Sequence, residues 1–189
     1  MRIFIALDIP AEIRSQIREY MERGRPYAPE ARWARPEGLH VTLKFVGEVS
    51  EAKVQEIKSA LVAVKAQPFD VTFSGAGFFP TAKSPRVFWI GVEGGEPLPR
   101  LARAIDDTTH RLGIAKEERA FSPHLTLARS ADRSGRSHLL RPLQHLLERE
   151  PVPQFGTMTA QEFWLYRSEL ARGGSKYTKL ERYEIAAGS

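Results

Sequence analysis

Two short segments of the chain alternate apolar and polar residues in the pattern of a β-strand. Residues 39–46 read LHVTLKFV, and residues 123–130 read PHLTLARS. Because successive side chains of a strand point to opposite faces, His40 shares a face with Thr42, and His124 shares a face with Thr126. Leucine and valine occupy the opposite faces. Each segment therefore predicts a strand with one face fit for a core and one face that carries an imidazole and a hydroxyl.

The remaining pattern predicts a mixture of helices and strands. Apolar residues at helical spacing predict helices over 10–23, 50–64, 97–113 and 138–150. Apolar or alternating runs predict further strands over 2–9, 69–80, 86–92, 158–170 and 176–185, the last two joined by a glycine turn. Several of these strands follow one another without an intervening helix. That order favours an α+β protein with antiparallel sheets over a doubly wound parallel sheet.

Composition narrows the class of protein. A chain of 189 residues with 42% hydrophobic and 27% charged residues suits one globular domain. No apolar stretch is long enough to span a bilayer, and Asp8 and Pro10 interrupt the N-terminal apolar run, which argues against a signal peptide. We therefore expect a cytoplasmic protein.

The absence of cysteine excludes disulfides, thiolate zinc sites and cysteine nucleophiles. The net charge of +5 suits a polyanionic partner such as nucleic acid, although a solvated basic surface has the same composition.

The two His-x-Thr pairs predict proton transfer if they line one cleft. One neutral imidazole takes a proton from an attacking water or hydroxyl, and the other, protonated, gives a proton to the leaving oxygen. The hydroxyls of Thr42 and Thr126 donate hydrogen bonds to oxygens on which negative charge develops. This chemistry needs no metal and no covalent intermediate. It suits a phosphodiester, particularly a strained cyclic one.

Other interpretations compete with this one. A single His-x-Thr strand is often only a packing feature with a satisfied histidine. A metal site would need three or four ligands, but neither strand carries another His, Asp or Glu on its polar face. His110, His138 and His145 lie on predicted helices among charged residues and are interpreted as surface residues. An RNA-binding module that grips phosphate without turnover would be better served by Arg or Lys. Paired acid–base catalysis fits the pattern best.

The chain resembles the 2H phosphoesterase superfamily, and most closely its bacterial and archaeal RNA 2′,3′-cyclic phosphodiesterases, also called 2′-5′ RNA ligases. The segment HVTLKFVGEV is similar to the first signature of that family, and FSPHLTLAR is similar to the second. The segments RIFIAL, RVFWIGV, LYRSEL and KYTKL are similar to flanking elements. The resemblance therefore runs almost from end to end.

This resemblance implies a single domain over 1–189 with a bilobal α+β fold, in which two antiparallel sheets face a central cleft with helices on the outside. Each lobe supplies one His-x-Thr strand. The implied activity opens an RNA 2′,3′-cyclic phosphate end to a 2′-phosphomonoester without a cofactor, with reversible 2′-5′ ligation as a side reaction. By position, His40 is the proton donor to the departing 3′ oxygen, His124 is the acceptor that activates water, and Thr42 and Thr126 hold the phosphate.

The expected partner is RNA with a 2′,3′-cyclic phosphate end, with tRNA fragments among the candidates, and we expect a monomer. The alternative substrate is a small cyclic phosphate, such as a nucleotide or an ADP-ribose derivative.

Four further residues are candidates for substrate binding. Arg129 matches an arginine that commonly ends the second signature, yet strand parity places it opposite His124, so a cleft contact and a surface position are both open. Lys44 has the parity for the cleft, where the alternative is a solvated strand end. Phe45 and Phe121 are candidates to stack a base, although parity favours core packing for both.

Overall fold

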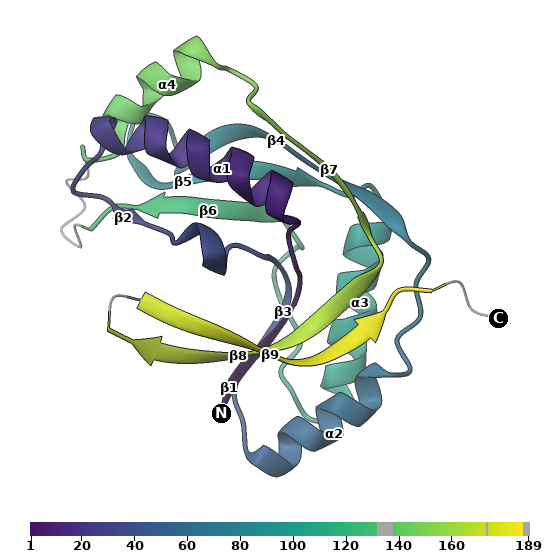
Figure 1. Ribbon diagram of the computed structural model, residues 1–189. Helices are drawn as coiled ribbons and strands as arrows, with labels where there is room; N and C mark the ends of the chain where they lie inside the picture. The colour runs from purple at the N-terminus through teal and green to yellow at the C-terminus, as the bar shows by residue number, and fades with distance from the viewer. Residues whose placement is uncertain (132–137, 173, 187–189) are drawn as a thin grey trace.

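The computed structural model describes residues 1–131, 138–172 and 174–186, which form two antiparallel sheets and four α-helices (Figure 1). The first sheet has the strand order β3-β1-β8-β9, and the second has the order β2-β6-β5-β4-β7. The strands are β1 (Arg2–Leu7), β2 (Arg32–Trp33), β3 (Val41–Glu48), β4 (Phe69–Pro80), β5 (Pro85–Glu93), β6 (His124–Arg129), β7 (Gln154–Ala160), β8 (Glu162–Ala171) and β9 (Gly174–Glu184). The α-helices are α1 (Ala11–Gly24), α2 (Glu51–Leu61), α3 (Pro97–His110) and α4 (Gln144–Arg149).

The two His-x-Thr strands lie in different sheets. Strand β3 belongs to the first sheet and β6 to the second. Helix α1 packs against β7 and α3 against β3, and Figure 1 shows α1 and α4 on the outer side of the second sheet, with α2 and α3 beside the first. We call each sheet with its two helices a lobe. The predicted α+β fold, with two antiparallel sheets and outer helices, is confirmed.

The lobes do not correspond to the two halves of the chain. Strands β4 and β5 lie in the first half of the sequence but pair within the second sheet, whereas β8 and β9 return to the first sheet. Strand β1 is consequently hydrogen-bonded between β3 and β8, which come from opposite halves of the chain. Each lobe is therefore built from both halves, and the chain crosses between lobes several times.

The apolar face of α1 makes much of the core behind the second sheet. Ile13, Ile17 and Tyr20 are buried on it, and the ring of Tyr20 lies edge-on to Phe155 of β7 at a centroid distance of 5.3 Å. Full burial of one such side chain contributes about 1.5–3 kcal/mol to folding. This packing fixes the second sheet from behind and leaves the side of β6 that bears His124 exposed.

Two predicted elements are wrong in extent. The strand expected over 158–170 is two strands, β7 and β8, because the chain passes from the second sheet to the first at Gln161. The helix expected over 138–150 is only α4, preceded by a 3₁₀ turn at 141–143, because Pro142 lacks the backbone N–H that a continuous helix needs.

Strands β8 and β9 form the predicted C-terminal hairpin, and residue 173 in its turn lies outside the described residues. Within the described ranges, no helix has both the length and the apolar character required to cross a membrane.

Candidate active site

A cleft of about 410 Å³ is lined by both His-x-Thr pairs. His40 immediately precedes β3 and His124 begins β6, so each sheet contributes one histidine at the start of a strand. The structure thus brings together the four residues predicted for the site. His40 is half-buried and His124 is exposed, whereas Thr42 and Thr126 are both half-buried.

Strand β3 has a β-bulge directly after its threonine. Thr42 is paired with Ala6 of β1, and Lys44 is paired with the neighbouring Ile5. Leu43 is therefore an extra residue with no partner of its own in β1. A bulge of this kind reverses the face on which each later side chain of the strand lies.

The same bulge recurs in β6. Thr126 is paired with Trp89 of β5, and Ala128 is paired with the neighbouring Phe88, which leaves Leu127 as the extra residue. The two copies of the motif therefore share a backbone irregularity at the same leucine as well as a sequence. This shared irregularity decides where the residues after each motif point.

The bulges overturn the parity predictions for Phe45 and Arg129. Strict alternation predicts core packing for Phe45, but its side chain is 63% exposed and lines the cleft. Alternation also predicts Arg129 on the face opposite His124, but Arg129 lines the same cleft as that histidine. Both residues lie two positions after the extra leucine of their strand. Phe121 is half-buried and lines the cleft from the loop before β6, with part of its ring against the core.

Lys44, a candidate for substrate binding by parity, is buried at the edge of the cleft rather than solvated, with only 4% of its surface exposed. Its Nζ donates to Asp106 Oδ1 of α3 at 2.6 Å and to the carbonyl oxygen of Ala115 at 2.7 Å. Both acceptors belong to the protein itself, so the ammonium group has its hydrogen-bond partners within the fold. The reason is again the bulge, which turns Lys44 away from the face of Thr42.

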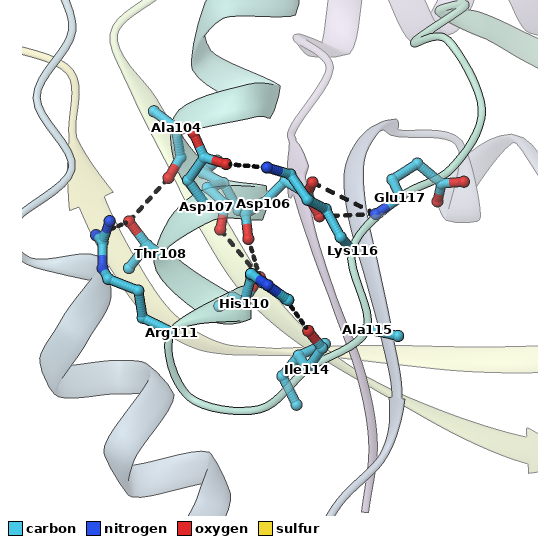
Figure 2. Close-up of polar contacts among 12 residues, drawn as sticks. Ala104, Asp106, Asp107, Thr108, His110, Arg111, Ile114, Ala115, Lys116 and Glu117 are labelled. Atoms are coloured by element: carbon cyan, nitrogen blue, oxygen red, sulfur yellow. Dashed lines mark hydrogen bonds and ion pairs between the residues drawn. The ribbon is translucent and has the colours of Figure 1, made fainter.

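The Asp106 carboxylate also holds the loop that leads into β6. It accepts a hydrogen bond from the backbone N–H of Glu117 at 3.2 Å. Figure 2 shows Asp106 and its neighbour Asp107 at this loop, where Asp107 forms an ion pair with Lys116 at 2.9 Å. Lys44 and Asp106 therefore connect the strand of the first motif to the loop before the second.

The backbone fixes the same tautomer in both histidines of the cleft. His40 Nδ1 donates to the carbonyl oxygen of Gly38 at 2.7 Å, and His124 Nδ1 donates to the carbonyl oxygen of Ser122 at 2.9 Å. A carbonyl oxygen only accepts, so Nδ1 carries the proton in each ring. Nε2 is then the nitrogen free for proton transfer in both.

Aromatic rings surround His40. Phe4 stacks on it at a centroid distance of 4.5 Å, and Tyr177 meets it edge-on at 5.1 Å. Burial lowers the pKa of the His40 ring to about 4, and the charge of Arg14 acts in the same direction. The hydrogen bond to Gly38 opposes this shift without cancelling it. His40 is therefore neutral at pH 7 in the free protein.

Arg14 is a site-supporting residue that the sequence analysis missed. Its Nη1 donates to the carbonyl oxygens of Pro36 at 2.6 Å and Leu39 at 3.0 Å, and its Nη2 donates to Asp8 Oδ1 at 2.9 Å. These bonds hold the segment that ends at His40. No local pattern reveals the bonds to Pro36 and Leu39, because these two residues lie more than 20 positions further along the chain.

The rest of the cleft is basic and contains no gathered metal ligands. Arg119 and Arg129 line it, and so does Glu117 of the loop before β6. Nowhere in 1–131, 138–172 or 174–186 do three or more His, Asp or Glu side chains gather as a metal site would require. His110, His138 and His145 are exposed, as predicted, and do not line the cleft.

Comparison with known proteins shows that the chain matches a family model. The family model described as LigT like Phosphoesterase matches residues 7–89 and matches again over 90–177. The chain belongs to the LigT-like phosphoesterase family. The resemblance inferred from the two signatures is thereby confirmed, and the two matches each contain one His-x-Thr motif.

Curated relatives and solved structures agree with the family. The RNA 2′,3′-cyclic phosphodiesterase of Thermotoga maritima is 39% identical over 190 residues, which cover all of this chain and 97% of the relative. The protein of the same name from Escherichia coli is 33% identical, over 97% of this chain and 96% of the relative. A crystal structure of E. coli LigT complexed with 3′-AMP superposes with a TM-score of 0.78 at 32% identity, covering 98% of each chain.

Proposed function

We propose that the protein hydrolyses the 2′,3′-cyclic phosphate ends of RNA to 2′-phosphomonoesters by two-histidine acid–base catalysis. The observation that carries the proposal is the pair of histidines in one cleft, each with Nδ1 bonded to a backbone carbonyl and Nε2 free. The names of relatives at 33–39% identity over nearly the whole chain support the substrate.

The proposed reaction needs one proton acceptor and one proton donor. Nε2 of His124 accepts a proton from water as the water oxygen attacks phosphorus. Nε2–H of protonated His40 gives its proton to the 3′ oxygen as the bond from phosphorus to that oxygen breaks. The products are a 2′-phosphomonoester and a free 3′-hydroxyl. The hydroxyls of Thr42 and Thr126 donate to the non-bridging oxygens, where charge increases in the transition state.

The low pKa of His40 sets a condition on this assignment. A ring with a pKa of about 4 carries no proton to donate at pH 7 in the free protein. An anionic phosphate beside the ring favours the charged form and raises the pKa. In the proposed cycle, His40 therefore takes up its proton as the substrate binds.

Three further features complete the proposal. The two rings and two hydroxyls supply proton transfer and charge stabilisation, so the reaction proceeds without a divalent cation. A 5′-hydroxyl that replaces the attacking water produces a 2′-5′ linkage without a nucleoside triphosphate, and the reaction is reversible. All four site residues come from one chain, so a monomer has a complete site.

The test is incubation of the protein, in excess EDTA, with an oligonucleotide that ends in a 2′,3′-cyclic phosphate, followed by mapping of the product phosphate. We expect the phosphate on the 2′ oxygen. A 3′-phosphate would refute the proposed direction of attack, and dependence on an added metal would refute the acid–base mechanism. Binding of the oligonucleotide without turnover would favour the competing RNA-binding module, and turnover of small cyclic phosphates alone would favour the alternative substrate class.

A further inference from the structure

A second hollow, of about 230 Å³, adjoins the active-site cleft at His40. Phe45 and Tyr177 line both spaces, so the hollow and the cleft share one wall. The hydrolysis of the terminal cyclic phosphate, as proposed above, leaves the hollow unused. Its remaining polar lining consists of Arg2, Ser168 and Ser175.

The shared wall presents aromatic surface to solvent. Phe45 is 63% exposed and Tyr177 is 37% exposed, and the rings of both lie close to Phe4, at 6.2 Å and 5.2 Å between centroids. Phe45 occupies this place only because the bulge at Leu43 turns it out of the core. Exposed aromatic rings at the edge of a basic cleft are the usual platform for a nucleic-acid base, which offers a flat face whatever its identity.

The far end of the hollow offers a cation and hydroxyl groups. Arg2 lies on β1 two residues before Phe4, about 7 Å along the strand, and its guanidinium forms no ion pair or hydrogen bond within the described ranges. Ser168 is directly paired with it in β8. An exposed guanidinium without an internal partner suits a phosphate oxygen, and nearby hydroxyls suit the sugar and phosphate.

We propose that this hollow binds a second nucleotide of the RNA, with its base against Phe45 and Tyr177 and its phosphate beside Arg2. This inference rests on the proposed function, which places the cyclic phosphate between His40 and His124. The second nucleotide makes the enzyme selective for RNA ends over free mononucleoside cyclic phosphates. It therefore decides between the two substrate classes that the motif alone leaves open.

The test uses binding as well as turnover, so that the two proposals fail separately. Dissociation constants are measured for a nucleoside 2′-monophosphate and for a dinucleotide that ends in a 2′-phosphate. We expect the dinucleotide to bind about 5- to 150-fold more tightly, which is the contribution of one stacked base. Phe45→Ala and Arg2→Ala should each reduce this ratio. Arg2→Ala should also lower the slope of log affinity against log salt for the dinucleotide by about 0.7, the value for one phosphate contact to a single strand.

Arg167→Ala is the matched control. Arg167 precedes Ser168 in β8, points to the opposite face of the sheet, and is 42% exposed in an ion pair with Glu169. It should change neither the ratio nor the salt slope. Equal binding of the two ligands, or a ratio that Arg2→Ala leaves intact, would overturn the subsite whether or not the protein turns over a cyclic phosphate.

A third arm identifies the strand from which the second nucleotide comes. A short RNA with a free 5′-hydroxyl is added together with the nucleoside 2′-monophosphate. An Arg2-dependent gain in this arm alone would show that the hollow binds the strand that attacks in ligation, and it would overturn the assignment of the hollow to the RNA end that carries the phosphate. A gain with the dinucleotide assigns it to the strand that carries the phosphate. Loss of hydrolysis of every cyclic substrate, with the dinucleotide preference retained, would refute the proposed function and not the subsite.

Discussion

The two His-x-Thr sites share a sequence, a bulge and a backbone hydrogen bond, but they differ in what surrounds the ring. His40 lies among Phe4, Tyr166 and Tyr177, and burial lowers its pKa to about 4. His124 begins an exposed strand end, with its Nδ1 bonded to the Ser122 carbonyl. The backbone hydrogen bond therefore fixes the same tautomer in both rings, whereas the aromatic surroundings of His40 lower the pKa of that ring.

The largest expected effect tests whether both rings are needed despite this difference. His40→Ala and His124→Ala should each lower kcat/KM for an oligonucleotide 2′,3′-cyclic phosphate by about 10²–10⁴-fold, because each removes a ring to which the proposed reaction assigns the acid or the base. His110→Ala, at the exposed end of α3, is the control and should leave the rate unchanged. Near-normal activity of His40→Ala or His124→Ala would contradict a mechanism with two histidines.

A second variant breaks the connection between the two sites. Lys44→Met leaves Asp106 as a buried charge without its ion-pair partner, and this should lower the free energy of unfolding by about 3–5 kcal/mol. Urea denaturation measures the change. Because the pair also holds the loop before His124, kcat/KM should fall in the protein that remains folded.

Asp107 offers a matched control for this prediction. It is adjacent to Asp106 on α3 and pairs with Lys116 in the same loop, but both side chains are about half-exposed. Asp107→Asn should therefore change stability little, since exposed ion pairs contribute little. If Lys44→Met and Asp107→Asn had equally small effects, the buried pair would have no special part in joining the two motifs.

The smallest expected effect concerns the enclosure of His40. Tyr177→Ala removes one of the aromatic rings that enclose His40 and lets water reach the imidazole. The pKa of His40 should therefore rise from about 4 toward its ordinary value of 6.5. NMR titration of the ring measures this. Tyr27→Ala, which removes a ring 6.4 Å from the exposed His145, should leave His40 unchanged. An unchanged His40 pKa in Tyr177→Ala would mean that the tyrosine contributes nothing to the enclosure.

Residues before each bulge were predictable from the sequence, and residues after it were not. Alternation places His40 and Thr42 on the polar face because the pairing with β1 is regular up to that point. The same rule fails at Phe45 and Arg129, since one inserted residue reverses the face and the sequence does not mark which leucine is extra.

Tertiary contacts explain the other gaps between sequence and structure. The apolar run 2–9 predicts a buried strand, but it does not predict that the ring of Phe4 stacks on the ring of His40. The bonds from Arg14 to the segment before His40 join positions that only the fold brings together. The split of residues 158–170 into β7 and β8 likewise depends on the pairing of each half with a different sheet, because both halves have strand-like sequences.

The proposed role of His40 as proton donor is tested most directly by an NMR titration of its ring in the free protein and in the presence of saturating nucleoside 2′-monophosphate. In the free protein the ring should titrate near pH 4. With the bound phosphate anion its pKa should rise, because the anion stabilises the protonated ring that the donor role requires. A His40 ring that titrates near 6.5 in the free protein would contradict the enclosure of the ring. A pKa that does not change when the phosphate binds would contradict the uptake of a proton with the substrate.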